Sequence, residues 1–181
     1  MTVEFDQRYR TNFERDDNHL IVPVYMFHYN LGRTLAKVST DFIFDTGAKM
    51  TLIPAATARA YNYDALPTLH TTRFGGIVPG MYMTVEYKRI PGVKLVGKYI
   101  NQVVVAIPCN PEEPAYHTYS INILGQNVLE YFDYFMDTKN DQIYFLKNTD
   151  PKPINEYAAC GNIFTADESA FNALHRANGE H

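Results

Sequence analysis

The residue best suited to catalysis is Asp45, which follows the apolar run FIF and precedes Thr46 and Gly47. Two carboxylates held close together share one proton, because like charges at that distance cannot both ionise. The charged one can then take a proton from water while the protonated one donates a hydrogen bond to a carbonyl group. Such a site needs an aspartate fixed at a strand end, a small residue beside it and a hydroxyl that holds the loop. Asp-Thr-Gly supplies these parts, although it also suits an ordinary strand-to-turn junction.

A second motif, Ile123-Leu124-Gly125, is followed by a pattern that predicts a short helix and then a strand. Together with the Asp-Thr-Gly turn and its apolar flanks, it resembles the retropepsin family of aspartic proteases over residues 20–147. In that family the two apolar residues lie in a strand beside the catalytic loop, and the glycine lets the next helix begin. The resemblance implies an aspartic endopeptidase whose catalytic residue is Asp45. The residues that it implies as supports of the catalytic loop are Thr46, Gly47 and Ala48.

The glycine-rich stretch FGGIVPGM stands where this family has its flap. A flap is a hairpin that closes over the substrate, excludes water and donates backbone hydrogen bonds to an extended peptide. The plainer alternative is a β-hairpin with a glycine turn. By resemblance, the residues expected to form the flap and the substrate groove are Phe74, Gly75, Gly76, Ile77, Gly80 and Met81.

The number of catalytic motifs predicts the assembly. A single-chain enzyme of this kind needs two such turns, and the chain has one, because Asp137 and Thr138 are followed by Lys139 and not by glycine. A complete carboxylate pair therefore requires two copies of Asp45, which predicts a homodimer with the site on its twofold axis. The expected substrate is an extended peptide or protein. The alternative is a dimeric module of the same fold that binds peptides without cutting them, and the intact Asp45 favours the enzyme.

Two positions depart from the retroviral members of the family. Those enzymes often carry an aspartate four residues after the catalytic one and an arginine after the Ile-Leu-Gly glycine, and the two pair. Here the positions hold Lys49 and Gln126. Because this ion pair cannot form, we expect the dimer contacts and the rim of the groove to be arranged differently. A charged Lys49 would favour the ionised form of the carboxylate pair, although an exposed lysine has little effect.

The elements around these motifs are mostly strands. They are predicted at 20–29, 34–44, within 71–90, in two pieces within 92–107, up to the Ile-Leu-Gly motif and at 142–148. Short helices are predicted after Pro54 and at 126–135, and the proline-rich segment 108–120 is predicted to be a loop. Many short strands with glycine turns predict an all-β fold. With the resemblance, this becomes a closed acid-protease barrel, a single retropepsin-like lobe with a short helix after the Ile-Leu-Gly motif.

The chain is predicted to form one domain with an extension at each end. Residues 1–18 are charged, which indicates a flexible arm or an edge strand that needs a partner. Residues 19–149 form the expected protease domain. In residues 150–181, a Thr165-x-x-Glu168 capping box and apolar residues at helical spacing predict an amphipathic helix. The 108–120 loop or this helix could cover the cleft, but packing of the helix on the barrel is the simpler expectation.

Composition excludes several other classes. With a net charge of −4 the chain lacks the basic excess of a nucleic-acid binder, and its basic stretch from Lys88 to Lys98 is expected to be a solvated strand face. No apolar run is long enough to cross a membrane and no signal-peptide pattern is present, which predicts a cytoplasmic protein. The six histidines are scattered, so no metal and no cofactor are expected. Cys109 and Cys160 are expected to be free thiols, with one disulfide as the alternative.

Overall fold

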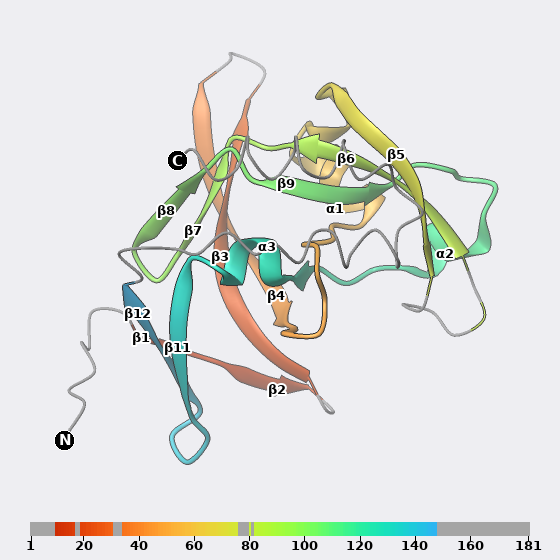
Figure 1. Cartoon of the computed structure of the whole chain (residues 1–181). Helices are drawn as coiled ribbons and strands as arrows, with labels where there is room; N and C mark the ends of the chain where they lie inside the picture. The colour runs from red at the N-terminus through yellow and green to blue at the C-terminus, as the bar shows by residue number, and fades with distance from the viewer. Residues whose placement is uncertain (1–9, 17–18, 31–33, 76–79, 81, 148–181) are drawn as a thin grey trace.

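A computed structural model of the chain describes residues 10–16, 19–30, 34–75, 80 and 82–147. These residues form mostly strands, arranged in three sheets with short helices between them (Figure 1). The helices are α1 (Ala55–Ala60), the 3-10 helix η2 (Tyr63–Ala65), α2 (Pro114–Thr118) and α3 (Gln126–Leu129). The prediction of a β-rich fold with little helix is therefore confirmed.

The largest sheet carries the candidate catalytic residue at the end of its strand β4. Its strands run in the order β10 (Ile123–Leu124), β4 (Leu35–Phe44), β3 (His19–Tyr29), β7 (Gly92–Leu95) and β8 (Lys98–Asn101), and β2 (Glu14–Asp16) also pairs with β3. Strands β3 and β4 pair antiparallel along most of their length, as the predicted hairpin requires. Strand β10 is parallel to β4 and pairs with its last two residues. The end of β4 therefore lies inside the sheet, between β3 and β10.

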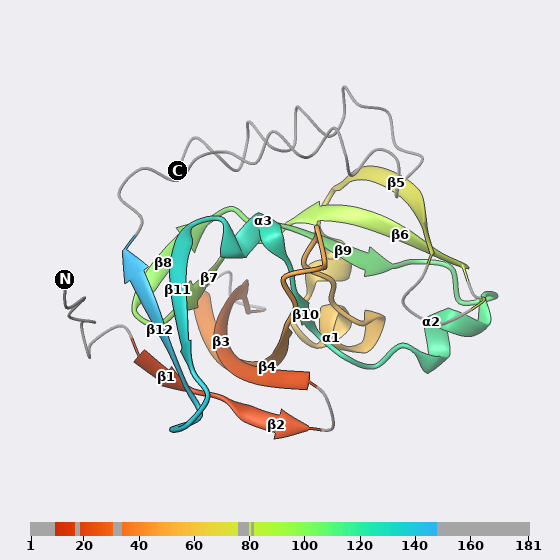
Figure 2. The ribbon, with the colours of Figure 1, turned by 60° about the horizontal axis from the view of Figure 1, so that its bottom comes forward.

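Two smaller sheets flank this one. The second sheet consists of β5 (Thr68–Gly75), β6 (Tyr82–Arg89) and β9 (Val104–Pro108), and the third consists of β1 (Arg10–Asn12), β12 (Gln142–Lys147) and β11 (Phe132–Asp137). Figure 2 shows the third sheet on the left and the second on the right, with β3, β4 and β10 between them. The β5–β6 hairpin is the one in which the flap was predicted.

The predicted closed barrel is not found among the described residues, whose strands pair in three separate sheets. A common apolar core joins the three sheets, and the segment around Leu52 also links the large sheet to the second one through backbone hydrogen bonds to β10 and β9. That core contains Val22 and Met26 from the large sheet, Val105 from the second sheet, and Phe132 and Phe145 from the third. Burial of apolar surface is not directional, so sheets can pack on one another without a continuous ladder of hydrogen bonds.

Several segments form other elements than predicted. The segment 108–120 contains α2, which begins at Pro114 and buries Ala115. The helix predicted within 126–135 ends at Leu129, because the aromatic segment after it pairs with β12 as strand β11. Residues 92–107 contain three strands, where two were predicted. The N-terminal arm agrees with one of its two predicted alternatives, since Arg10–Asn12 and Glu14–Asp16 are edge strands that pair with β12 and β3. The predicted C-terminal helix lies outside the described residues.

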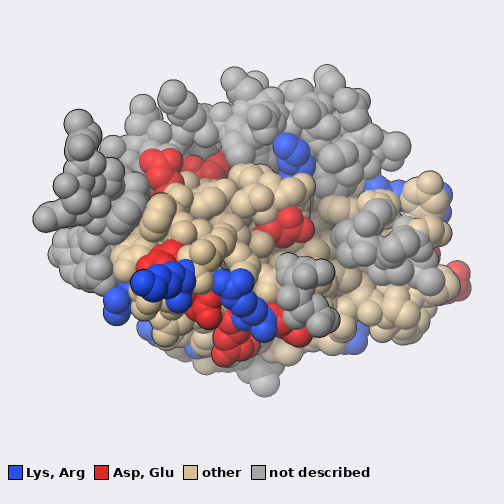
Figure 3. All heavy atoms as spheres, turned by 90° about the horizontal axis from the view of Figure 1, so that it is seen from below, with Lys and Arg blue, Asp and Glu red and all other residues tan. Residues whose placement is uncertain are grey.

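Charged side chains on the face seen from below are of both signs (Figure 3). Acidic and basic side chains lie next to one another on the described part of this face, with uncharged areas between them. Binding to a nucleic-acid backbone requires a concentration of positive charge. The described part of this face does not present one.

Candidate active site

Asp45 lies where β4 leaves the large sheet. Its backbone N–H donates to the Leu124 carbonyl (3.2 Å), and its carboxylate Oδ1 accepts a hydrogen bond from the Gly47 N–H (2.9 Å). The Ala48 N–H donates to the Asp45 carbonyl (3.3 Å), which closes the turn. A Cβ at position 47 would lie 3.2 Å from Asp45 Oδ1, so a larger residue would crowd the carboxylate. The half-buried carboxylate is therefore oriented by the backbone of its own turn.

Strand β10, the Ile-Leu-Gly motif, holds both ends of this turn. On one side it lies parallel to the end of β4 and accepts the Asp45 N–H at Leu124. On its other side Ile123 exchanges two hydrogen bonds with Leu52, each 2.9 Å long. The chain thus enters the turn beside β10 and leaves it beside the same strand. The structure brings the two sequence motifs together.

Helix α3 starts directly after β10, and its first N–H groups bind the turn. The N–H of Gln126 donates to the Ala48 carbonyl (2.8 Å), and that of Asn127 donates to the Lys49 carbonyl (3.2 Å). The first N–H groups of a helix have no partner within the helix and are available for such contacts. The side-chain Nε2 of Gln126 also donates to the Thr46 carbonyl (2.6 Å). The residue that stands in place of the family's arginine therefore supports the turn through a neutral hydrogen bond.

A buried polar network lies behind the turn, and the sequence did not predict it. Asn127 Oδ1 accepts from the backbone N–H (2.8 Å) and the hydroxyl (2.9 Å) of Thr51, and Asn127 Nδ2 donates to the Val104 carbonyl (2.7 Å). The Gly125 N–H in turn donates to Thr51 Oγ1 (3.1 Å). Thr51 and Asn127 are 0% and 2% exposed, so these bonds compensate for the loss of water. A threonine and an asparagine among apolar residues were the available signal, and that pattern is too common to point to a site.

An apolar cluster joins the β5–β6 hairpin to the turn. We call it the hairpin cluster, and its buried members are Met50, Leu52, Phe74, Met83, Val85, Tyr87, Val104, Ala106, Ala115, Tyr119 and Ile123. Phe74 and Met83 come from the hairpin, Met50 follows the turn, and Ala48 packs against the cluster. The β5–β6 hairpin, close to the turn end of its strands, and the Asp45 turn therefore share one packed surface.

The residues predicted for the flap are only partly described. Phe74 and Gly75 end strand β5, and Gly80 has a φ of +74°, a left-handed conformation that glycine adopts without strain. This conformation agrees with a turn at the end of the hairpin. The other predicted flap residues, Gly76, Ile77 and Met81, lie outside the described residues.

Asp137, the acid of the incomplete second motif, lies at the end of β11 in the turn that leads to β12. Its carboxylate accepts hydrogen bonds from the N–H of Lys139 (3.1 Å), the N–H of Asn140 (3.2 Å) and the side-chain Nδ2 of Asn140 (2.8 Å). The side-chain bond from Asn140, with the two backbone bonds, lowers the pKa of Asp137. This carboxylate therefore holds the turn between β11 and β12.

Other classes of site were searched among the described residues. They contain no group of three or more His, Cys, Asp or Glu side chains arranged to hold a metal ion. No helix in these parts of the chain is long and apolar enough to cross a membrane. Cys109 carries a free thiol, and Cys160 lies outside the described ranges. Burial, with the charges of Glu86 and Glu113, raises the pKa of Cys109 to about 11, so its thiol is protonated at neutral pH.

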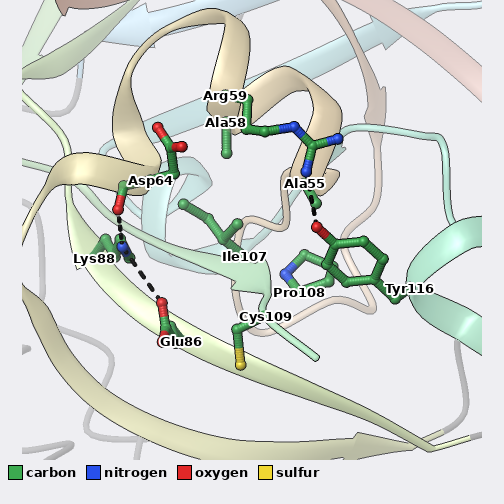
Figure 4. A pocket seen from close by; sticks show the side chains of 10 residues that line it. All are labelled: Ala55, Ala58, Arg59, Asp64, Glu86, Lys88, Ile107, Pro108, Cys109 and Tyr116. Atoms are coloured by element: carbon green, nitrogen blue, oxygen red, sulfur yellow. Dashed lines mark hydrogen bonds and ion pairs between the residues drawn. The ribbon is translucent and has the colours of Figure 1, made fainter. Parts of the chain in front are cut away.

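A hollow of about 200 Å³ lies between α1, β6 and the end of β9 (Figure 4). Lys88 lines it and is 5% exposed, so the prediction of a solvated face is wrong for this residue. Its Nζ donates to the carbonyls of Asp64 (2.6 Å) and Leu66 (3.0 Å) and lies 3.4 Å from the Glu86 carboxylate. These partners use the three N–H donors of the ammonium group. Lys88 therefore joins β6 to the segment around η2.

Replacing Lys88 with methionine is expected to lower the free energy of unfolding by about 2–3 kcal/mol. The change leaves two carbonyls and a carboxylate without their donor, and the partly exposed Glu86 recovers some of the loss through water. Urea denaturation measures the effect. The control is Lys94→Met at a more exposed lysine, which is expected to stay within about 0.5 kcal/mol of the wild type. Equal losses in the two variants would contradict the role assigned to Lys88.

Comparisons with known proteins bear on the fold. No protein-family model matches the chain, and no curated protein sequence matches it. Among solved structures, the chain is similar to a retropepsin-like aspartic protease from Rickettsia conorii, with a TM-score of 0.52 over 75% of this chain and 89% of that one. The sequence identity is 17%, so the similarity shows a common fold and leaves the activity to be argued from the site.

Proposed function

We propose that the chain is a homodimeric aspartic endopeptidase that activates water between two Asp45 carboxylates, one from each subunit. The observation that carries the proposal is the orientation of the Asp45 carboxylate, which accepts a hydrogen bond from the Gly47 N–H. Strand β10 forms backbone hydrogen bonds with the chain on both sides of this turn. The fold similarity to a retropepsin-like aspartic protease supports it. Residues 19–149 would form the protease domain.

The proposed reaction needs both carboxylates and no other cofactor. One Asp45 is ionised and takes a proton from water, whose oxygen attacks the carbonyl carbon of the peptide bond. The partner's Asp45 is protonated and donates a hydrogen bond, then the proton, to the carbonyl oxygen. In the second step the proton taken from water passes to the amide nitrogen. The carbon–nitrogen bond then breaks, and one hydroxyl of the intermediate returns its proton to the partner's Asp45, which gives a carboxylic acid and an amine and restores the shared proton of the pair.

The neighbouring residues have supporting roles in this proposal. Gly47 orients the carboxylate through its N–H, while Thr46 and Ala48 offer their carbonyls to Gln126 and so fix the turn. The β5–β6 hairpin would act as the flap that holds an extended peptide over the two carboxylates. Its contact with the turn through the hairpin cluster supports this role.

Cleavage of a diverse peptide library tests the proposal. The protein is expected to cut a subset of peptides between mildly acidic and neutral pH, and a pepstatin-type inhibitor is expected to stop it. Sedimentation at the assay concentration is expected to show a dimer. A folded dimer that binds peptides but cuts none would support the non-catalytic binding module instead. A strictly monomeric protein that still cuts peptides would overturn the shared site.

A further inference from the structure

Glu113 lies between β9 and β10, at the N-terminus of α2, and its carboxylate binds the hairpin rather than the helix. The residue makes no side-chain hydrogen bond to the helix that it precedes. Instead, its Oε2 accepts from the Thr84 N–H and its Oε1 accepts from the Thr84 hydroxyl, both at 2.6 Å. Hydrogen bonds of this length to a carboxylate are charge-assisted and stronger than those between neutral groups.

The bond to the Thr84 N–H takes the place of a backbone hydrogen bond at the end of the β6–β9 ladder. Strand β6 pairs with β9 as far as Val85, which lies opposite Pro108. Beyond this pair the Cys109 N–H donates to the Thr84 carbonyl (3.0 Å). In a regular antiparallel ladder the Thr84 N–H would donate back to the Cys109 carbonyl. Here the Glu113 carboxylate accepts that N–H and stands in for the missing backbone acceptor.

The segment that carries Glu113 is braced against the same hairpin. Asn110 starts the turn, because its carbonyl accepts from the Glu113 N–H (3.2 Å) and its Oδ1 accepts from the Glu112 N–H (3.1 Å). Helix α2 and the residue after it then bury Ala115 and Tyr119 in the hairpin cluster. The segment expected to be a loop that could cover the cleft therefore lies against the side of the hairpin.

The charges around the carboxylate favour its ionised form. Arg73 lies opposite Thr84 on β5, and its guanidinium acts on Glu113. Burial by itself raises the pKa of Glu113, but the hydrogen bonds from Thr84 and Asn110, with the charge of Arg73, outweigh burial and lower the pKa. The contact therefore persists in mildly acidic solution, where a free glutamate would begin to protonate.

We infer that Glu113 is a positioning residue that anchors the β5–β6 hairpin at Thr84, opposite Arg73 and close to the end where β6 begins. Among the described residues, Tyr82 and Met83, on the turn side of Thr84, pair with Gly75 and Phe74 of β5 and with no strand outside the hairpin. Loss of the carboxylate releases this anchor without touching Asp45. The consequence for substrate binding rests on the proposed function, whereas the anchoring itself does not.

Amide hydrogen exchange of the protein without peptide tests the inference. In Glu113→Ala, fragments from β5 and β6 are expected to exchange about ten-fold faster or more, which corresponds to the loss of one charge-assisted hydrogen bond. Fragments from β3 and β4 are expected to exchange as in the wild type. Glu113→Gln, which keeps an acceptor for the Thr84 N–H, is expected to show a smaller increase. The control Glu112→Ala, at the exposed neighbouring glutamate, is expected to show none.

A second variant keeps the test decisive if Glu113→Ala does not fold. Thr84→Val removes the hydroxyl donor alone, and its effect is not expected to add to that of Glu113→Gln, because the two changes share one interaction. Unchanged exchange of the hairpin in these folded variants, or equal acceleration throughout the chain, would overturn the inference. In a cleavage assay Glu113→Gln is expected to raise KM more than it lowers kcat. A protein that cuts no peptide but shows the local exchange would disprove the protease and leave the anchor in place.

Discussion

An Asp45→Asn variant is expected to lose at least about a thousand-fold in kcat/KM for peptide cleavage. Asparagine has nearly the same shape as aspartate, and its carbonyl oxygen can still accept the Gly47 N–H bond that orients the side chain. It cannot take a proton from water, so the change removes the chemistry and keeps the fold. The control is Asp41→Asn, an exposed carboxylate on the same strand, which is expected to keep the wild-type rate. Cleavage by Asp45→Asn at the wild-type rate would exclude Asp45 as the catalytic residue.

Mixed dimers show whether the two carboxylates work together. When wild-type and Asp45→Asn subunits exchange freely, a site is complete only if both of its subunits are wild type. Activity should then fall as the square of the wild-type fraction, to about a quarter in an equal mixture. A linear fall, to about half, would mean that each subunit acts alone and would contradict the shared site.

The Asp45 turn and the Ile-Leu-Gly strand could be predicted because each is a short motif of residue types that resembles one in a known family. A glycine two residues after Asp45 is needed for the backbone N–H to reach the carboxylate, and a glycine after Leu124 is needed where the chain passes the turn closely. Each requirement appears in the sequence as a short motif, which can be identified without knowing where the other motif lies. The hairpins could be predicted for a similar reason, since their strands are neighbours in sequence.

The features that the sequence did not predict depend on partners far away in the chain. Lys88 can be buried because two carbonyls more than twenty residues earlier accept hydrogen bonds from its ammonium group. Glu113 acts on Thr84, 29 residues before it. Nothing in the local pattern of a lysine or glutamate tells which distant backbone group it will meet. The helix after Gly125 was predicted too long for the same reason, because its end is set by the pairing of β11 with β12.

Replacing Gly125 with alanine is expected to lower the free energy of unfolding by at least about 3 kcal/mol. A Cβ at this position would overlap the carbonyl carbon and oxygen of Met50 and would lie 2.8 Å from the Thr51 amide nitrogen. These are backbone atoms, so no rotation of a side chain relieves the overlap. Urea denaturation followed by circular dichroism measures the loss.

The control Gly97→Ala separates close packing from backbone conformation. Gly97 has a φ of +83° and no atom within 4 Å of its added Cβ, so alanine there costs only the left-handed strain, about 1 kcal/mol. Equal losses in the two variants would mean that the approach of β10 to the turn is not what stabilises this region. The Gly125→Ala change is also expected to lower the rate of cleavage. The Leu124 carbonyl of β10 accepts a hydrogen bond from the Asp45 N–H, so any shift of that strand moves the carboxylate. A folded Gly125→Ala protein is therefore expected to cut peptides more slowly, whereas Gly97→Ala keeps the wild-type rate.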